Sequence, residues 1–488
     1  MIEKDKLTMI FGADNVYYEQ SMLDKYSSDM SFVNRITPGC VVKVKNSEDI
    51  QKLVELAKET PTPLVPVSSG PPHFRGDTVP GTGGAIIVDL SGMKKIINIS
   101  REARVAMFEP GVTFGELIPA VTRAGLRLNL PLMPRKTKSV VGSLLEREPV
   151  ILPKYHWDIA DPLNCVEIIY GTGDMFRTGA AAGPGSIEEQ WAAGGAQVEA
   201  AGPSSASWYR IIQGAQGTMG IVTWASERCE ILPSLEEPFL IGSSSLTRMI
   251  DMIHWLVRHR IPNECFIVNN SNLAAMMAKK SPVIHQDIKD SLPQWILFYN
   301  VAGYDYLPEE RVRGQAADAE DIAQQIGLKP VEVIGRVTAS EILKATKKPS
   351  PEPYWKIRQK GGCQEIFFIT IHDKLSSIID SMNQVAEDAG YSPQDIGMYI
   401  QPLVQGSNIH CEFDLFYNPE NQKEAERVKE LAGYSINKLM DKGAFFSRPY
   451  GENTGTIMNK DAATVVTLHK VKALLDPENI MNPGKLCF

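Results

Sequence analysis

The chain has 488 residues, of which 43% are hydrophobic and 22% charged, and its formal net charge at pH 7 is −8. This length exceeds what one hydrophobic core usually supports and predicts two or three packed domains. The acidic balance, with no Lys/Arg-rich run, argues against a nucleic-acid partner. We therefore expect a small-molecule substrate.

Neither targeting nor metal signals are present in the sequence. No apolar stretch approaches the roughly 20 residues that span a bilayer, and residues 1–12 lack an apolar signal core, so we expect a cytoplasmic protein without a membrane span. The seven cysteines are scattered singly and form no C-x-x-C pair, which argues against an iron–sulfur cluster or a structural zinc site. An organic cofactor would have to carry any electrons.

The first 130 residues predict short strands that alternate with amphipathic helices, as in an α+β domain. Residues 40–67 are expected to form a strand, a helix capped by Ser47, and a second strand. Thr113 is expected to cap a later helix that ends at Gly125. Between these helices we expect strands at 84–90, 97–100 and 104–112.

Residues 180–207 form an excursion rich in Gly, Ala, Ser and Pro. A solvated loop is one interpretation, and a lid or dimer contact anchored by Trp191 is the other.

The composition shifts around residues 232–238, which indicates a domain boundary. Beyond it, long helical patterns alternate with strands, and helices laid on one antiparallel sheet are the natural packing. The expected helices cover 245–260, 309–327, 374–390 and 420–443, and the expected strands cover 294–303, 364–372 and 408–417.

Three spaced segments, at 66–93, 138–149 and 211–223, are each expected to be a strand that runs into a backbone-rich turn. Backbone N–H groups in such turns can hold the pyrophosphate of a flavin or dinucleotide. Each glycine run is weak evidence alone, because turns between strands are glycine-rich anyway. No G-x-G-x-x-G follows a first strand, so a Rossmann site is not supported.

Taken together, these segments resemble the vanillyl-alcohol oxidase / p-cresol methylhydroxylase family of FAD-dependent enzymes. The resemblance also takes in the segments 37–57, 154–157, 166–179 and 474–486. It implies a two-subdomain FAD-binding domain of the PCMH type at 1–235, an α+β cap domain on an antiparallel sheet at 236–445, and a return to the FAD domain at 446–488. It also implies bound FAD and a homo-oligomer.

The resemblance assigns cofactor-binding roles to four regions. The loop Ser68–Gly76 would wrap the pyrophosphate, a second group would line the adenosine, a third would lie along the cofactor, and the C-terminal residues would close over it. The residues are Ser68, Ser69, Gly70, Pro71, Pro72, His73, Phe74, Arg75 and Gly76; Lys138, Ser139, Gly142, Ser143 and Glu146; Gly217, Gly220, Ile221 and Val222; and Asn482 and Lys485.

The first loop departs from the family pattern, because Pro71, Pro72 and Phe74 stiffen it. His73 lies one place from where some relatives carry a histidine bonded to the flavin. Covalent linkage there is one possibility, but packing or a hydrogen bond to the pyrophosphate, with non-covalent FAD, is preferred. Arg75 falls where the aryl-alcohol oxidases have a phenolate-binding tyrosine, so it is expected to bind an anionic substrate or a phosphate.

A second departure lies in the turn before residue 139. Pro134 takes the place of the aspartate that serves the aryl-alcohol oxidases as active-site base. Arg135, Lys136 and Lys138 bring cations close to the expected flavin. They are interpreted either as a solvated basic turn or as neutralisation of FAD phosphates, a substrate carboxylate or reduced flavin.

A third departure concerns metal binding. The 2-hydroxy-acid dehydrogenases of the superfamily bind a divalent metal through histidine-containing motifs. Here His410 is retained, but Leu403 and the pair Pro449–Tyr450 replace its partners. One histidine does not hold a catalytic metal, so no metal site is expected.

The strand at 408–417 places His410, Glu412 and Asp414 on one face. A solvated sheet edge would explain these polar groups, and an acid–base set that faces the substrate is the alternative. The aryl-alcohol oxidases carry their flavin-linked residue near this point, so His410 or Cys411 could occupy that position.

Arg448 aligns with the arginine that stabilises a substrate phenolate in the aryl-alcohol oxidases, and Tyr450 could supply the phenol donor that Ser447 lacks.

We therefore expect an FAD-dependent oxidoreductase that moves a hydride to flavin N5 from an aromatic, phenolic or other anionic alcohol-type substrate. A 2-hydroxy-acid dehydrogenase that passes electrons to a partner protein and a non-catalytic flavoprotein subunit are the alternatives. The candidate catalytic residues are Arg448, Tyr450, His410, Arg75 and Tyr155, with His156 as a further cavity candidate.

Overall fold

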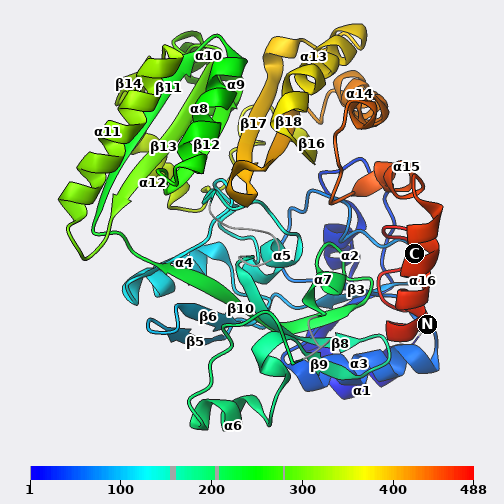
Figure 1. Ribbon diagram of the computed structural model, residues 1–488. Coiled ribbons are helices and arrows are strands. Elements are labelled where there is room, and N and C mark those ends of the chain that lie inside the picture. The colour runs from blue at the N-terminus through cyan, green and yellow to red at the C-terminus, as the bar shows by residue number, and fades with distance from the viewer. Residues whose placement is uncertain (1, 154–160, 204–207, 279–280) are drawn as a thin grey trace.

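The computed structural model describes residues 2–153, 161–203, 208–278 and 281–488. Figure 1 shows an upper lobe, formed mainly by the middle of the chain, over a lower lobe that holds both termini. Within the described ranges, no helix combines the length and hydropathy that crossing a bilayer requires.

The first sheet of the lower lobe has the strand order β1-β2-β4-β3, and β4 runs parallel to both β2 and β3. Side chains alternate along each strand, so Val42 packs in the cluster that contains α1 and α3, whereas Val41 packs in the one that contains α2. The strands are β1 (Val16–Tyr17), β2 (Cys40–Lys43), β3 (Leu64–Val67) and β4 (Ile86–Asp89), and the helices are α1 (Lys4–Phe11), α2 (Gln20–Ser27) and α3 (Ser47–Glu59).

The predicted cap of α3 is wrong by one residue. Asn46 is the cap: its backbone is extended and its side-chain oxygen accepts a hydrogen bond from the backbone N–H of Asp49 at 2.9 Å. Ser47 is already helical. Asparagine and serine are about equally good caps, so the sequence alone did not choose between neighbours.

The second sheet has the order β5-β6-β10-β8-β9, and β7 also pairs with the long strand β10. The predicted cap of α4 is confirmed, because the Glu116 carboxylate accepts from the backbone N–H and the hydroxyl of Thr113. The strands are β5 (Ile96–Ser100), β6 (Val105–Phe108), β7 (Leu126–Leu128), β8 (Leu163–Tyr170), β9 (Met175–Arg177) and β10 (Gly220–Ile231), and the helices are α4 (Phe114–Arg123), α5 (Val140–Leu145) and α7 (Tyr209–Ile212).

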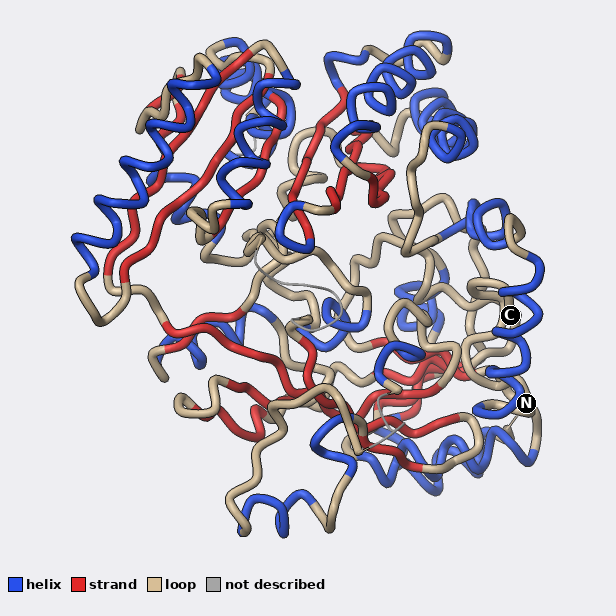
Figure 2. Tube along the Cα trace, in the orientation of Figure 1, coloured by secondary structure: helices blue, strands red, loops and turns tan. Residues whose placement is uncertain are grey.

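The Gly/Ala-rich excursion carries the short helix α6 (Ile187–Ala192). Figures 1 and 2 place α6 at the bottom of the lower lobe, on the side away from the upper lobe. Trp191 donates from Nε1 to Oε1 of Gln197 at 2.8 Å and packs beside Trp224 and Ile187. The lid interpretation is therefore wrong, and the dimer contact stays a prediction.

The upper lobe contains a six-stranded antiparallel sheet of order β11-β13-β12-β17-β18-β16. Strands β13, β16 and β18 were predicted from the sequence, whereas β11, β12 and β17 were not. The strands are β11 (Leu235–Ser243), β12 (Glu264–Asn269), β13 (Trp295–Gly303), β16 (Gly362–Thr370), β17 (Ile396–Leu403) and β18 (Asn408–Tyr417), with a small hairpin of β14 (Val333–Ile334) and β15 (Val337–Thr338).

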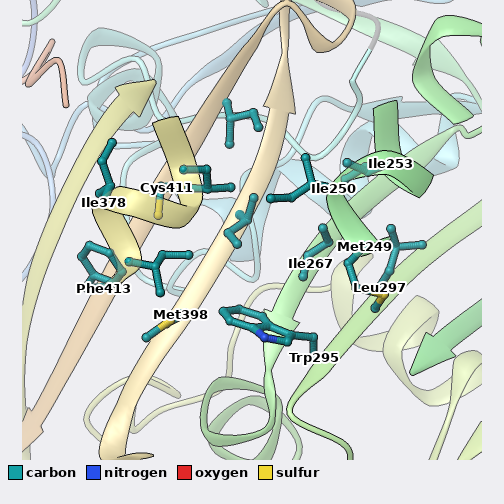
Figure 3. Packing of buried hydrophobic residues seen from close by; sticks show 14 of the residues in the cluster. Met249, Ile250, Ile253, Ile267, Trp295, Leu297, Ile378, Met398, Cys411 and Phe413 are labelled. Atoms are coloured by element: carbon teal, nitrogen blue, oxygen red, sulfur yellow. The ribbon is translucent and has the colours of Figure 1, made fainter. Parts of the chain in front are cut away.

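The two faces of this sheet have different neighbours. One face packs against α8 (Leu246–Arg258), α11 (Pro308–Ile326), α13 (His372–Asp388) and α14 (Gln422–Asp441), and Figure 3 shows part of this apolar core. The other face packs against α9 (Asn270–Met277), α10 (Pro282–Asp290), α12 (Ala339–Thr346) and residues 132–133 and 151–152 of the lower lobe. The second face therefore looks toward the lower lobe.

The last part of the chain returns to the lower lobe through α15 (Thr454–Met458) and α16 (Ala462–Leu475), which Figure 1 shows beside the N-terminus. The backbone N–H of Leu64 donates to the carbonyl of Ile480 at 2.7 Å. Lys472, which is buried, donates to the carbonyls of Thr218 and Met481 at 2.6 and 2.8 Å. The α+β architecture expected from the sequence is confirmed.

Candidate active site

One cavity, here called the cofactor cavity, lies in the lower lobe where all three predicted segments meet. Its free space is about 1400 Å³, including the part open to solvent. Most of the predicted cofactor-binding residues line it, and so does Tyr450. These residues are Ser68, Ser69, His73, Phe74, Arg75, Lys138, Gly142, Glu146, Gly217, Gly220, Ile221 and Val222.

The other predicted cofactor-binding residues do not line the cavity. Ser139 caps α5, because its hydroxyl accepts from the backbone N–H of Gly142 at 2.9 Å. Asn482 joins two loops by donating to the carbonyls of Asp77 and Gln216 at 3.0 and 2.7 Å. These side chains hold the wall in place. The predicted residues that do not line the cavity are Gly70, Pro71, Pro72, Gly76, Ser139, Ser143, Asn482 and Lys485.

The three cations of the turn 135–138 have different environments. Lys136 is exposed. Lys138 forms ion pairs at 2.8 Å with both Glu146 and Glu148. Arg135 is only 6% exposed, lies 4.9 Å from the centre of the Phe74 ring, and lines the cofactor cavity. Its Nη1 has no hydrogen-bond partner within the described part of the chain.

His73 lies in the wall of the cofactor cavity with one ring nitrogen engaged. Its Nε2 is 2.9 Å from the carbonyl oxygen of Ser69. Burial lowers the pKa of His73, which favours the neutral ring. This contact holds the loop between β3 and β4 together.

The upper-lobe sheet brings polar side chains to the face that looks toward the lower lobe. In the β16–β18 pair, Glu365 lies opposite Asp414, and Phe367 lies opposite Glu412. In the β17–β18 pair, Tyr399 lies opposite Glu412. β18 lies between β16 and β17, so the solvated-edge interpretation of His410, Glu412 and Asp414 is wrong: all three are buried.

The ammonium group of Lys356 lies at the centre of three carboxylates. It donates to Glu365 and Glu412 in short hydrogen bonds and lies 3.1 Å from Oδ1 of Asp414. Burial acts to lower the pKa of Lys356, but the three carboxylates raise it well above its usual value. Burial raises the pKa of Asp414 to about 8, although Lys356 acts to lower it.

A second cavity, the substrate cavity, lies between this cluster and the cofactor cavity. Its free space is about 390 Å³, again including open space. Arg75, Glu148, Tyr354 and Glu365 line both cavities, so the two adjoin. The substrate cavity is also lined by Lys356, Tyr399, Glu412 and Arg448.

Arg75 stands at the junction of these cavities and is neutralised by three carboxylates. Its guanidinium forms a short ion pair with Glu146 and further pairs with Glu148 and Glu365 at 3.2 and 3.4 Å. Burial acts to lower the pKa of Arg75, and the three carboxylates raise it well above its usual value. Arg75 therefore holds the wall together and brings little uncompensated charge.

Arg448 is the contrasting cation. It is 5% exposed, its Cζ lies 4.3 Å from the centre of the Phe367 ring, and its Nη1 makes a long 3.4 Å contact with the carbonyl of Glu146. No carboxylate of the described residues lies within ion-pair distance of it. Burial first, and then the nearby Arg75, lower the pKa of Arg448 to about 10.

The remaining predicted residues lie at different depths. His410 lines none of these cavities; its Nε2 lies 3.6 Å from Oε2 of Glu412, and burial lowers its pKa. Cys411 points to the opposite face, into the apolar core of Figure 3. Tyr155 and His156 lie outside the described residues.

Comparison with known proteins identifies the scaffold. The family described as FAD binding domain matches residues 38–179, and the family described as FAD linked oxidases, C-terminal domain, matches residues 456–486. The flavoprotein subunit of 4-cresol dehydrogenase (hydroxylating) from Pseudomonas putida is 23% identical over 98% of this chain and 94% of its own. The chain carries these two domains of FAD-linked oxidases, and the matches support the PCMH-type FAD-linked oxidoreductase family.

Solved structures agree with this assignment of the fold. p-Cresol methylhydroxylase with bound substrate superposes with a TM-score of 0.81 at 20% identity, covering 99% of this oxidoreductase and 96% of that chain. 4-Ethylphenol oxidase from Gulosibacter chungangensis gives a TM-score of 0.83 at 17% identity, covering 99% and 95%. A glycolate oxidase subunit of Bacillus subtilis is 21% identical over 99% of this chain and 96% of its own.

The cofactor cavity of this oxidoreductase fits FAD. The unpartnered Nη1 of Arg135 offers a buried donor for an anionic oxygen. Gly217 has a φ of +71°, and a Cβ there would lie 2.5 Å from Cγ of Pro66, so only glycine allows the turn to line the cavity. Arg135 and the turn at Gly217 would hold the cofactor. FAD supplies a hydride acceptor when it is bound.

Sequence reasoning missed the cluster around Lys356. Lys356 lies in an irregular loop between α12 and β16, where no periodicity marks a function. The position of Glu365 could have been narrowed down from the sequence. β16 and β18 are both recognisable strands, and antiparallel pairing puts alternate residues of each on one face of the sheet. The register of the pair, which decides which carboxylates meet, was not available from the sequence.

Proposed function

We propose that this FAD-dependent oxidoreductase oxidises a carbon next to oxygen or to an aromatic ring, in a substrate whose anionic group binds Arg448. The single observation that carries the proposal is the buried guanidinium of Arg448, which faces the substrate cavity without a carboxylate partner among the described residues.

A buried cation without a counter-ion is costly, because burial removes its hydration. The two other cations of the substrate cavity, Arg75 and Lys356, are each surrounded by three carboxylates. Arg448 instead has the face of Phe367 and a weak contact with one carbonyl. A phenolate or carboxylate would supply the missing charge through charge-assisted hydrogen bonds.

The rest of the cavity suits an aromatic ring. Tyr354 and Tyr399 line it, and Tyr450 lines the adjoining cofactor cavity. Aromatic rings pack favourably edge to face. A phenol held beside Arg448 loses its proton more readily, because a nearby positive charge favours the anion. That effect reduces the need for a strong base, which is consistent with Pro134 in place of an aspartate.

The names of relatives support the same substrate class. Relatives that match nearly the whole chain include a 4-cresol dehydrogenase, and similar structures include a 4-ethylphenol oxidase. Glycolate oxidase and D-lactate dehydrogenase relatives support the 2-hydroxy-acid alternative. Against that alternative, Lys356 fills the space between Glu365, Glu412 and Asp414, the carboxylates that could hold a metal ion.

An electron acceptor outside the chain is also part of the proposal. One relative is the flavoprotein subunit of its enzyme, and another is a cytochrome-linked D-lactate dehydrogenase. Rapid flavin reduction by substrate with slow reoxidation by oxygen would support a protein acceptor.

The test is anaerobic reduction of the bound flavin by 4-ethylphenol, 4-cresol, D-lactate and glycolate in wild type, Arg448→Lys and Arg448→Ala. We expect reduction by the phenols, a loss of about 10- to 100-fold in Arg448→Ala, as for a lost hydrogen bond to a charged group, and partial retention in Arg448→Lys. Flavin content should not change. Reduction by D-lactate alone, or loss of flavin in Arg448→Ala, would contradict the proposal.

A further inference from the structure

A third cavity, here called the vestibule, lies between α14, β16 and residues 446–457. Its free space is about 1280 Å³, including the part open to solvent. Arg75 and Glu365 line the vestibule, the cofactor cavity and the substrate cavity alike. The 3.4 Å ion pair between these two side chains therefore stands where the three cavities meet.

The vestibule has a buried inner end and an exposed mouth. At the inner end, Arg448 is 5% exposed and is shared with the substrate cavity. At the mouth, Glu426, Lys429 and Glu430 on α14 are exposed, as is Glu452. The vestibule thus connects solvent with the residues around the proposed substrate.

Between these ends the wall is mostly apolar. Side chains from three separate parts of the chain contribute to it, and most of them are buried or half-buried although a cavity lies beside them. The apolar side chains that line the vestibule include Phe32, Ile366, Phe367, Ile436, Phe446 and Ile457.

We propose that the vestibule binds the apolar tail of an elongated substrate whose anionic, reacting head lies in the substrate cavity. This inference rests on the proposed function. The substrate cavity has about 390 Å³ of free space against about 1280 Å³ in the vestibule, so it is the smaller of the two. The vestibule adds space beyond Arg75 and Glu365 for an alkyl or aryl extension of the head.

The charge at the mouth restricts the end of this tail. Three carboxylates (Glu426, Glu430 and Glu452) and one ammonium (Lys429) give a net charge of +1 − 3 = −2. Lys429 is already paired with Glu452 at 2.9 Å. A tail that ends in a carboxylate would be repelled here, whereas a neutral or cationic end would be accepted.

Gly433 offers a way to fill the vestibule without touching the cofactor or substrate cavities. It lies in α14 and lines the vestibule, and the nearest atom to a Cβ placed there is Oδ1 of Asn453 at 3.5 Å. A larger residue also favours the helix. Gly433→Trp should therefore fold and project its ring into the vestibule. Gly314→Trp on α11, where nothing lies within 4 Å of an added Cβ, is the matched control.

The experiment measures binding of 4-ethylphenol and 4-heptylphenol by calorimetry to the FAD-loaded protein reduced with dithionite, so that no turnover occurs. Each methylene that leaves water tightens binding up to about fourfold, so the wild type should bind the heptyl compound at least tenfold more tightly. Gly433→Trp should lose that gain and keep its affinity for 4-ethylphenol within twofold. Gly314→Trp should behave as wild type.

Several outcomes would overturn the inference. If the wild type binds both phenols equally, or if Gly433→Trp does not weaken binding of the heptyl compound selectively, the vestibule does not hold the tail. A heptylphenol with a terminal carboxylate should bind less tightly than one with a terminal amine, and Glu426→Gln/Glu430→Gln should reduce the difference; the opposite order would count against the inference. If neither phenol binds the wild type, the proposed function itself fails and this inference fails with it.

Discussion

Replacing Lys356 with methionine should destabilise the protein strongly and in a pH-dependent way. The change keeps most of the side-chain volume and removes a buried ammonium whose side chain is 7% exposed. The carboxylates of Glu365, Glu412 and Asp414 then face one another without a cation. Removing one partner from a buried ionic group typically costs about 3–5 kcal/mol.

The structure gives an independent estimate of this cost. Ligand oxygens of the three carboxylates lie within 4.8 Å of one another. At an effective dielectric constant of about 20, two unit charges at that separation repel by about 3.5 kcal/mol, which corresponds to about 2.5 pKa units. In Lys356→Met one of the two ionised glutamates should therefore take up a proton at a pH about 2–3 units above its usual value. Below that pH, the destabilisation should shrink.

The assay is urea unfolding followed by circular dichroism at pH 5 and pH 8, with midpoints compared because a multidomain flavoprotein need not unfold in two states. Lys360→Met, at an exposed lysine of the same loop, is the control and should change the midpoint little. Lys356→Met/Glu412→Gln should recover part of the loss. A small, pH-independent effect of Lys356→Met, or additive losses in the double variant, would refute the reasoning.

Four further predictions concern single contacts. Arg135→Ala should weaken FAD binding to the apoprotein by about 10- to 100-fold, the value of one charge-assisted hydrogen bond, as measured by flavin fluorescence quenching; equal weakening in Lys136→Ala would contradict a specific role. The pKa of Asp414 is raised to about 8 by burial, so its stabilising contribution is complete below the unfolded pKa of about 4 and is lost as pH rises through 8. Asp414→Asn should therefore flatten the fall in melting temperature between pH 5 and 8, and an unchanged slope would argue against this titration. Adding Mn²⁺ should stabilise Lys356→Ala but not wild type, because oxygen ligands suit that ion; equal shifts would exclude a specific site. Lys472→Met should lower the melting temperature and release flavin at a lower temperature than Lys470→Met, an exposed control; matching curves would rule out this anchoring role.

Much of the fold was predictable because it depends on local patterns. The apolar positions of α3 and the cap of α4 by Thr113 and Glu116 each depend on a short stretch of sequence. The strands β11, β12 and β17 were missed because none shows a regular alternation of polar and apolar residues. β12 and β17 are buried at every position, and β11 has an irregular burial pattern.

In the site, too, local features could be predicted from the sequence, whereas contacts between distant segments could not. Backbone-rich turns such as that at Gly217 can be recognised from the sequence, because a glycine-rich segment beside a strand is a local signal. The partners of Lys356 cannot, since they come from β16 and β18 and meet only through strand register. The three cations of the turn 135–138 could not be told apart in the sequence. In the structure, Arg135 is buried without an ion pair to any described residue, Lys136 is exposed and Lys138 is paired with two glutamates.

The contacts of Asn482 have a consequence for how the protein matures. Asn482 joins the loop after Arg75 to the turn before Gly217, and its neighbour Met481 pairs with Leu64 at the edge of the first sheet. A ribosome makes residue 482 only after it has made the entire upper lobe. The wall of the cofactor cavity is therefore fastened late, and stable capture of FAD should follow synthesis of the upper lobe instead of accompanying synthesis of the first 235 residues.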